Sequence, residues 1–87
     1  MAQTAVDHGQ DDRRILTEAT VKAWELSLLL VRLFRSLAAI CASDETVMRQ
    51  WMAHENRALQ GIPSEQIRRV DGLVAVVDYL DAQRAVV

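Results

Sequence analysis

The stretch from Ile15 to Ala42 contains neither glycine nor proline, and most of its residues are good helix formers. An uninterrupted stretch of this length predicts one long helix, or two helices that meet near Trp24. A chain of 87 residues has room for one domain, and a domain this small has a thin core. The long helix is therefore expected to set the shape of the molecule.

This helix carries more apolar surface than one small domain can bury. One stripe at helical spacing is formed by Leu26, Leu30, Leu33, Leu37 and Ile40. A second stripe, expected on the opposite side, is formed by Trp24, Leu28, Val31 and Ala38. Soluble monomers seldom expose a contiguous apolar patch, so the second stripe predicts a homodimer through residues 20–42. The predicted dimer interface is Trp24, Leu28, Val31 and Arg35.

Three shorter helices are expected after the long one. Ser43 or Asp44 can cap a second helix that runs to about His54. The connection after it should turn sharply, with Asn56 bonded to its own backbone and Gly61 in a positive-φ conformation. Pro63 suits the first position of a short third helix, which places Ile67 facing inward.

The last helix has the clearest amphipathic pattern in the chain. It should begin near Asp71, and its inner face is expected to be Leu73, Val76, Val77 and Leu80. The pattern predicts that Val70 and Val74 widen this stripe, and that Asp78, Asp81 and Arg84 lie away from it. The expected fold is thus an all-α domain over residues 13–87, with one long N-terminal helix and three shorter C-terminal helices, preceded by a flexible tail at residues 1–12.

Composition and charge exclude several classes of function. Ten basic residues nearly balance twelve acidic ones, and a net charge of −2 gives no attraction toward nucleic acid. The start has no signal-peptide pattern, the longest apolar run is too short to span a membrane, and the single Cys41 suggests a reducing compartment. A cytoplasmic protein is expected.

The search for catalytic or metal-binding residues finds no site. His54 and Glu55 superficially resemble a zinc-protease helix, but the second histidine of that motif is replaced by Ala58. Cys41 is better explained as a small core residue than as a reactive thiol, and Arg68 and Arg69 as a solvated helix face. No catalytic residue, metal ligand or cofactor is predicted, and the chain is not expected to be an enzyme.

The region from Leu28 to Gln83, about two thirds of the chain, resembles the toxin-binding domain of the Xre/MbcA/ParS antitoxins. The residues that carry the resemblance, in order and spacing, are Trp51, Asn56, Leu59, Gly61, Pro63 and Gly72. One departure is Glu55, where the family often has a proline before the asparagine. Family members also usually carry a helix-turn-helix domain in front, for which "ILTEATVKA" leaves no room. DNA binding by this chain alone is therefore not expected.

The resemblance implies an antitoxin of a type II toxin–antitoxin system, whose partner is a RES-type toxin that consumes NAD or transfers its ADP-ribose part. The last helix and the C-terminus of such antitoxins block the active-site cleft of the toxin. The toxin-binding residues expected from the resemblance are Asn56, Leu59, Gly61, Pro63, Tyr79, Asp81, Arg84, Val86 and Val87. The alternatives are a helical adaptor that docks on an unrelated partner, and a DNA-binding repressor.

Overall fold

The computed structural model describes the backbone of residues 2–86 and the side chains of residues 12–85. It contains four helices, which are α1 (Ala2–Ile40), α2 (Glu45–Ala53), α3 (Pro63–Gln66) and α4 (Val70–Val86). No strand is found among these residues, apart from one isolated bridge between Asn56 and Gly61. The prediction of an all-α domain with one long helix and three shorter ones is confirmed, and α1 is a single helix without a break near Trp24.

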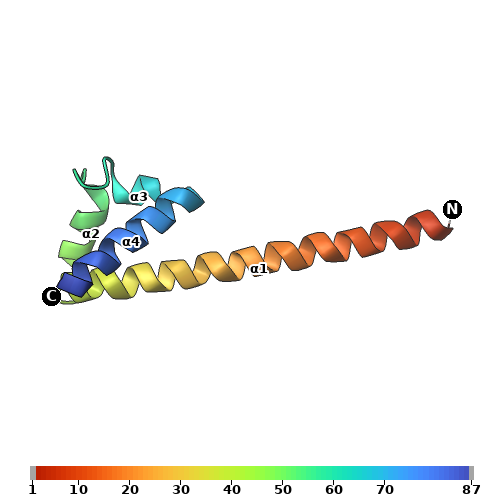
Figure 1. Ribbon diagram of the computed structural model, residues 1–87, viewed down its shortest axis with the longest axis horizontal. Helices are drawn as coiled ribbons and strands as arrows, with labels where there is room; N and C mark the ends of the chain where they lie inside the picture. Colours follow the sequence, from red (N-terminus) through yellow and green to blue (C-terminus); the bar gives the residue numbers. More distant parts are fainter. Residues whose placement is uncertain (1, 87) are drawn as a thin grey trace.

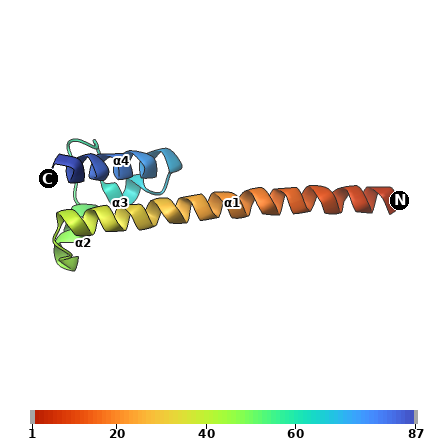
Figure 2. The same ribbon diagram turned by 60° about the horizontal axis from the view of Figure 1, so that its bottom comes forward.

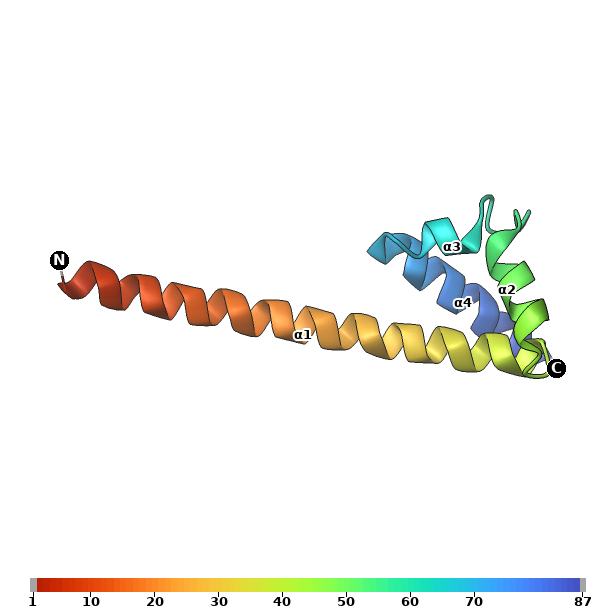
Figure 3. The same ribbon diagram turned by 180° about the vertical axis from the view of Figure 1, so that it is seen from behind.

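The molecule is strongly elongated because only the C-terminal half of α1 carries the other helices. Its extents are 61 × 22 × 21 Å, and Figure 1 shows α2, α3 and α4 gathered at one end of α1. Every side chain from Asp12 to Glu25 is exposed. Seen from behind, the N-terminal half of α1 projects alone, away from the other helices (Figure 3).

The segment 1–12 was expected to be a flexible tail. The helical backbone continues through it back to Ala2. The side chains before Asp12 lie outside the described residues, so the mobility of this segment stays a prediction.

The core forms where α4 lies along α1. The two helices run in the same direction (Figures 1 and 2), and α2 closes the end of the core. The buried cluster consists of Leu33, Leu37, Met48, Leu73, Val76, Val77 and Leu80. The inner face predicted for the last helix is therefore confirmed in all four of its residues.

The stripe predicted for the inner face of α1 is only partly right. Leu30 is 45% exposed, whereas Leu29 packs against the core and Ser36 is fully buried. The partner helix α4 lies closer to the Leu29 and Ser36 side, so the buried arc is rotated relative to the prediction. Ala38, which was assigned to the outer stripe, also packs against the core.

The polar and apolar borders of α4 also differ from the prediction. Val70 and Val74 are exposed, so they do not widen the apolar stripe. Asp81 is half-buried and bonded to α1 instead of lying away from the core. The Asp81 carboxylate can lie at the edge of the core because the Ser36 hydroxyl and the guanidinium groups of Arg32 and Arg84 lie next to it.

The turn between α1 and α2 uses left-handed backbone at two residues that are not glycine. Ala42 and Ser43 have φ angles of 53° and 60°, and the Ser43 N–H donates to the carbonyl of Ala38 at 2.8 Å. This arrangement satisfies carbonyl groups at the end of α1. Asp44 then caps α2, because its side chain accepts from the N–H groups of Thr46 and Val47 at 3.0 and 3.3 Å.

No single described helix is long and apolar enough to cross a membrane. Only the segment Asp12–Ile40 and α2 taken together have the length and apolar composition of a membrane span, and these two helices are bent by 115° relative to each other.

Candidate functional site

The loop between α2 and α3 is closed by Asn56 and Gly61. Their backbones exchange two hydrogen bonds, of 2.8 and 3.3 Å. The Asn56 side chain accepts from the N–H of Leu59 at 3.2 Å, as predicted for an asparagine that bonds its own backbone. The positive φ lies at Gln60, at 57°, and no described glycine has one, so the conformation predicted for Gly61 is wrong.

Gly61 instead lies close to the end of a side chain. A Cβ atom at this position would lie 2.8 Å from Nε2 of Gln66. That amide is held in place because it donates to the carbonyl of Leu59 at 2.6 Å. Gln66, whose role was missed in the sequence, thus fastens the loop to α3 from the inside.

Gly72 is required by the same residue. A Cβ atom at position 72 would lie 2.0 Å from the carbonyl oxygen of Gln66, a contact that the backbone cannot accommodate. Pro63 opens α3 at its first position, as predicted, and is fully buried. These residues fix how α3 enters α4, and Pro63 has no surface to offer a partner directly.

A stacked aromatic pair joins α2 to α4. The rings of Trp51 and Tyr79 have centroids 6.4 Å apart and planes 18° apart. Both side chains are half-buried, so each keeps part of its surface open to solvent. Trp51 also packs against the buried cluster.

A polar cluster fastens the C-terminal end of α4 to α1. The Ser36 hydroxyl donates to Oδ1 of Asp81 at 2.8 Å, and Arg32 forms an ion pair with the other carboxylate oxygen. Arg84 donates to the Ser36 oxygen at 3.4 Å. The hydrogen bond from Ser36, assisted by Arg32 and Arg84, holds the pKa of Asp81 below its ordinary value, against the effect of burial.

The predicted binding residues fall into two groups. Asn56, Leu59 and Gly61 lie in the loop between α2 and α3, whereas Asp81 and Arg84 lie on α4 and bond to Ser36 of α1. This loop and the C-terminal end of α4 lie apart in the molecule (Figures 1 and 3). Tyr79 lies on α4 between these two groups and contacts α2. The side chain of Val86 and the whole of Val87 lie outside the described residues, so their predicted contact with a partner stays a prediction.

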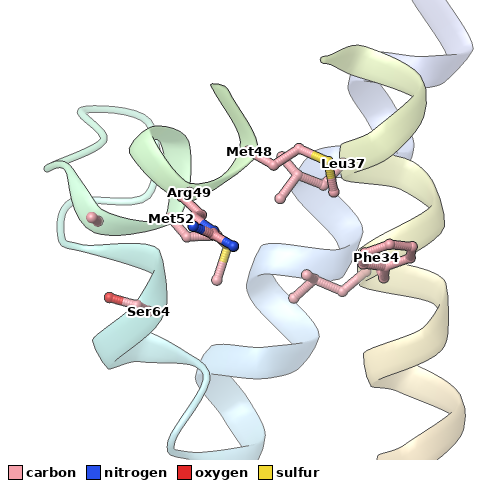
Figure 4. Close-up of a pocket in the computed structure, with 8 residues that line it drawn as sticks. Phe34, Leu37, Met48, Arg49, Met52 and Ser64 are labelled. Atoms are coloured by element: carbon pink, nitrogen blue, oxygen red, sulfur yellow. The ribbon is translucent and has the colours of Figure 1, made fainter. Parts of the chain in front are cut away.

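An apolar groove of about 330 Å³ lies between α1 and α2, beside α3. Figure 4 shows Phe34 and Leu37 on α1 facing Met48 and Met52 on α2. Arg49 and Ser64 are the polar residues that line it. This groove could not be predicted from the sequence, because its walls come from helices whose crossing no local pattern predicts.

The described side chains provide little catalytic chemistry. Among residues 12–85 no group of His, Cys, Asp and Glu could hold a metal ion. The ring Nδ1 of His54 lies 2.7 Å from the carbonyl of Gln50 on its own helix. Burial raises the pKa of the Cys41 thiol, with a further contribution from Asp44, which disfavours the reactive thiolate.

These features define a small helical binding module, in which buried contacts fix the ends of the helices. The model of the family "Antitoxin Xre/MbcA/ParS C-terminal toxin-binding domain" matches residues 32–85, which is more than half of the chain. The chain belongs to this family of antitoxin toxin-binding domains. No curated protein matches the chain. The match begins at Arg32 and includes Asp81 and Arg84, so it covers the helical domain and stops short of the projecting half of α1.

Proposed function

We propose that this chain is the antitoxin of a type II toxin–antitoxin system and that it neutralises a RES-type toxin by occluding the active site. The observation that carries the proposal is the match to the antitoxin toxin-binding domain over residues 32–85. The choice of a RES-type toxin, which consumes NAD or transfers ADP-ribose, rests on the resemblance of Trp51, Asn56 and Gly61 to the family pattern.

The proposed blocking element is the end of α4 with the residues that follow it. Asp81 anchors this end to Ser36 and Arg32, and Arg84, which donates to Ser36 in the same cluster, remains exposed. Preordering a helix end in this way lowers the entropy cost of inserting it into a cleft. Arg84 supplies charge for polar groups of the toxin, and Val86 and Val87 supply apolar contact.

The loop residues Asn56, Leu59, Gly61 and Pro63 have a supporting role in this proposal. Their hydrogen bonds and close packing fix α3, and through Gly72 they fix the start of α4. Tyr79 contributes the open face of its ring to the toxin. In this proposal the antitoxin has no catalytic role of its own, and it acts in the cytoplasm.

We also propose that the antitoxin forms a homodimer through the outer face of α1. Trp24, Leu28 and Val31 are all exposed there, and Arg35 ends the stripe. Substituting Leu28→Asp should give a monomer, measured as solution mass by sedimentation equilibrium. An unchanged mass would rule out this interface.

The test of neutralisation is to co-express the chain with the protein encoded beside it and to assay NAD consumption. The freed partner should consume NAD, and the purified complex should not. A partner that binds but leaves NAD untouched would support a helical adaptor instead, and a partner that does not bind at all would contradict the proposal.

A charge reversal locates the blocking element within that assay. Arg84→Glu should restore NAD consumption by the partner, because it places a negative charge at the inserted end. Arg68→Glu is the matched control, since Arg68 is also exposed but lies before the start of α4. Equal neutralisation by both variants would contradict the role given to Arg84.

A further inference from the structure

The outer face of α1 carries a second repeat with the spacing of a coiled coil. Val21, Trp24, Leu28 and Val31 follow one another at alternating steps of three and four, and Arg35 takes the next position. The four apolar residues are all exposed: Val21 by 51%, Trp24 by 67%, Leu28 by 54% and Val31 by 49%. The face is therefore an apolar seam that nothing in the chain covers between residues 12 and 85.

We propose that a second copy of the chain covers this seam with its own α1 running in the opposite direction. The inference rests on the homodimer proposed above and adds its orientation and register. In this register Leu28 packs on Val31 of the second copy, and Trp24 packs on Arg35 of the second copy. A two-fold axis repeats each pair, as an isologous dimer requires.

Charge favours this orientation over the parallel one. A parallel pair would place Arg35 directly against Arg35 of the second copy, at the end of an apolar seam. The antiparallel pair gives each guanidinium the face of a tryptophan, which is the best aromatic partner for a cation. The arginine that interrupts the seam thus becomes a specific contact instead of a repulsive one.

An ion pair between the two copies is also expected on one side of the same seam. Glu25 and Arg32 each follow a seam residue directly, Trp24 and Val31. In the antiparallel register Glu25 faces Arg32 of the second copy. Arg32 is also the ion-pair partner of Asp81, and its side chain remains 62% exposed, so it has surface available for Glu25 as well.

On the other side of the seam, Phe34 of one copy can pack against a hollow on α1 of the other copy. Phe34 has a large apolar side chain, yet it is 62% exposed. A hollow of about 390 Å³ on the projecting half of α1 is lined by Thr20, Val21, Ala23, Trp24 and Ser27. The antiparallel register places Phe34 of the second copy beside Ser27, at the edge of this hollow.

The pairing also covers part of the projecting half of α1. In this register residues 19–25 lie along positions 40 to 34 of the second copy, and residues 12–18 extend past the end of its α1. The helix α4 packs on the opposite face of α1, through Leu33 and Leu37. The end of α4 therefore stays open to the toxin in the dimer, and two toxins can bind to one antitoxin dimer.

The orientation is tested by one distance in the intact dimer. A nitroxide label at Ala19→Cys, in a Cys41→Ala background, points away from the seam and is measured by pulsed electron paramagnetic resonance. Antiparallel helices separate the two labels by about 30 Å along the axis, because each residue adds about 1.5 Å and position 19 faces position 40. In either orientation the outward-facing labels are also separated by the width of the two helices, about 20–25 Å. A peak at about 35–40 Å therefore supports the proposal, and a peak at about 25 Å or less, where only this width separates the labels, shows a parallel pair and overturns it.

The solution mass of the labelled protein is measured first and separates the two proposals. A monomeric mass would overturn the homodimer and its register together, yet neutralisation of the toxin could still be observed. A dimeric mass with a short distance would overturn only the antiparallel register.

A substitution series tests the contact made by Phe34. Phe34→Ala should weaken the dimer about tenfold or more, measured as the dissociation constant by sedimentation. Val47→Ala is the matched control, because Val47 is an exposed apolar residue on α2, away from the seam. An unchanged constant for Phe34→Ala would overturn the placement of this side chain in the hollow.

Discussion

Gln66 connects three segments that are separate in the sequence. Its side-chain amide bonds the Leu59 carbonyl and lies against Gly61, while its backbone carbonyl lies against Gly72. Both glycines of the family pattern are therefore explained by lack of space for a Cβ atom, and neither by a left-handed backbone. Packing around one residue sets the entry of the final helix.

Gly72→Ala should destabilise the fold by about 3 kcal/mol or more. The added methyl group would lie 2.0 Å from the Gln66 carbonyl oxygen, so the backbone of α3 or α4 must shift. The free energy of unfolding in urea measures the effect. Ala75→Gly, at an exposed position of the same helix, should cost only about 1 kcal/mol; equal losses for both variants would contradict the explanation.

The half-buried Asp81 makes stability depend on pH in the acid range. Its folded-state pKa lies below the ordinary value of 3.8, first because Ser36 donates a hydrogen bond and then because of Arg32 and Arg84. A lowered pKa contributes stability that is present above the unfolded value and is lost as the pH falls through the folded value. The wild type should thus be more stable than Asp81→Asn at pH 7.

This difference should shrink toward zero as the pH falls below about 3.8, the ordinary value for the group. Urea unfolding at a series of pH values measures it. Asp78→Asn, at an exposed position on the same helix, is the control. A gap between wild type and Asp81→Asn that stays constant with pH would show that the carboxylate charge does not matter.

At the scale of the element, α4 decides which face of α1 is buried. The sequence of α1 offers apolar residues on almost every side, including Leu28, Leu30 and Phe34. The regular stripe of α4, from Leu73 to Leu80, is fully buried. This stripe packs against the face of α1 that carries Leu33 and Leu37. The polar Ser36 lies on the same face, and its hydroxyl donates to Asp81.

Leu80→Ala should cost about 3 kcal/mol of unfolding free energy. The side chain is fully buried at the contact between α4 and α1, and its truncation leaves a cavity in a thin core. Val74→Ala on the exposed side of α4 should cost less than about 1 kcal/mol. Similar losses in chemical denaturation would mean that α4 packs through another face.

At the scale of the whole molecule, the shape is unusual for a chain that acts alone. Half of the longest helix projects into solvent with exposed apolar residues such as Leu16 and Trp24. An isolated helix of this length is marginally stable in water, because most helical stability in proteins comes from packing. The projecting half is consistent with a molecule that is complete only as a dimer.

Leu28→Asp should therefore unfold the projecting half of α1 while the core stays folded. Hydrogen exchange should show lost protection before Leu26, and unchanged protection around Leu33 and Val77. Val47→Asp, on the exposed surface of α2, should leave both regions protected. Full protection of residues 12–25 in Leu28→Asp would show that this segment is stable without a second copy.

The local structure of this protein follows from short-range features of its sequence. The absence of glycine and proline from Ile15 to Ala42 produces the long helix, Asp44 and Pro63 start the next two helices, and the period of Leu73 to Leu80 marks the inner face of the last. These are effects of backbone geometry, capping and hydrophobic spacing over a few residues. The family pattern is likewise visible in the sequence, because its residues occur in order and at fixed spacing.

The choice of which helix surfaces meet depends on tertiary packing. The rotation of the buried arc on α1, the partners of Asp81 and the reason for Gly61 and Gly72 all depend on how α3 and α4 approach segments distant in the chain. Such contacts have no local period, since α1 carries enough apolar residues to be buried on more than one side. Hydrophobic spacing predicts which face of a helix is buried only when the helix has a single apolar face.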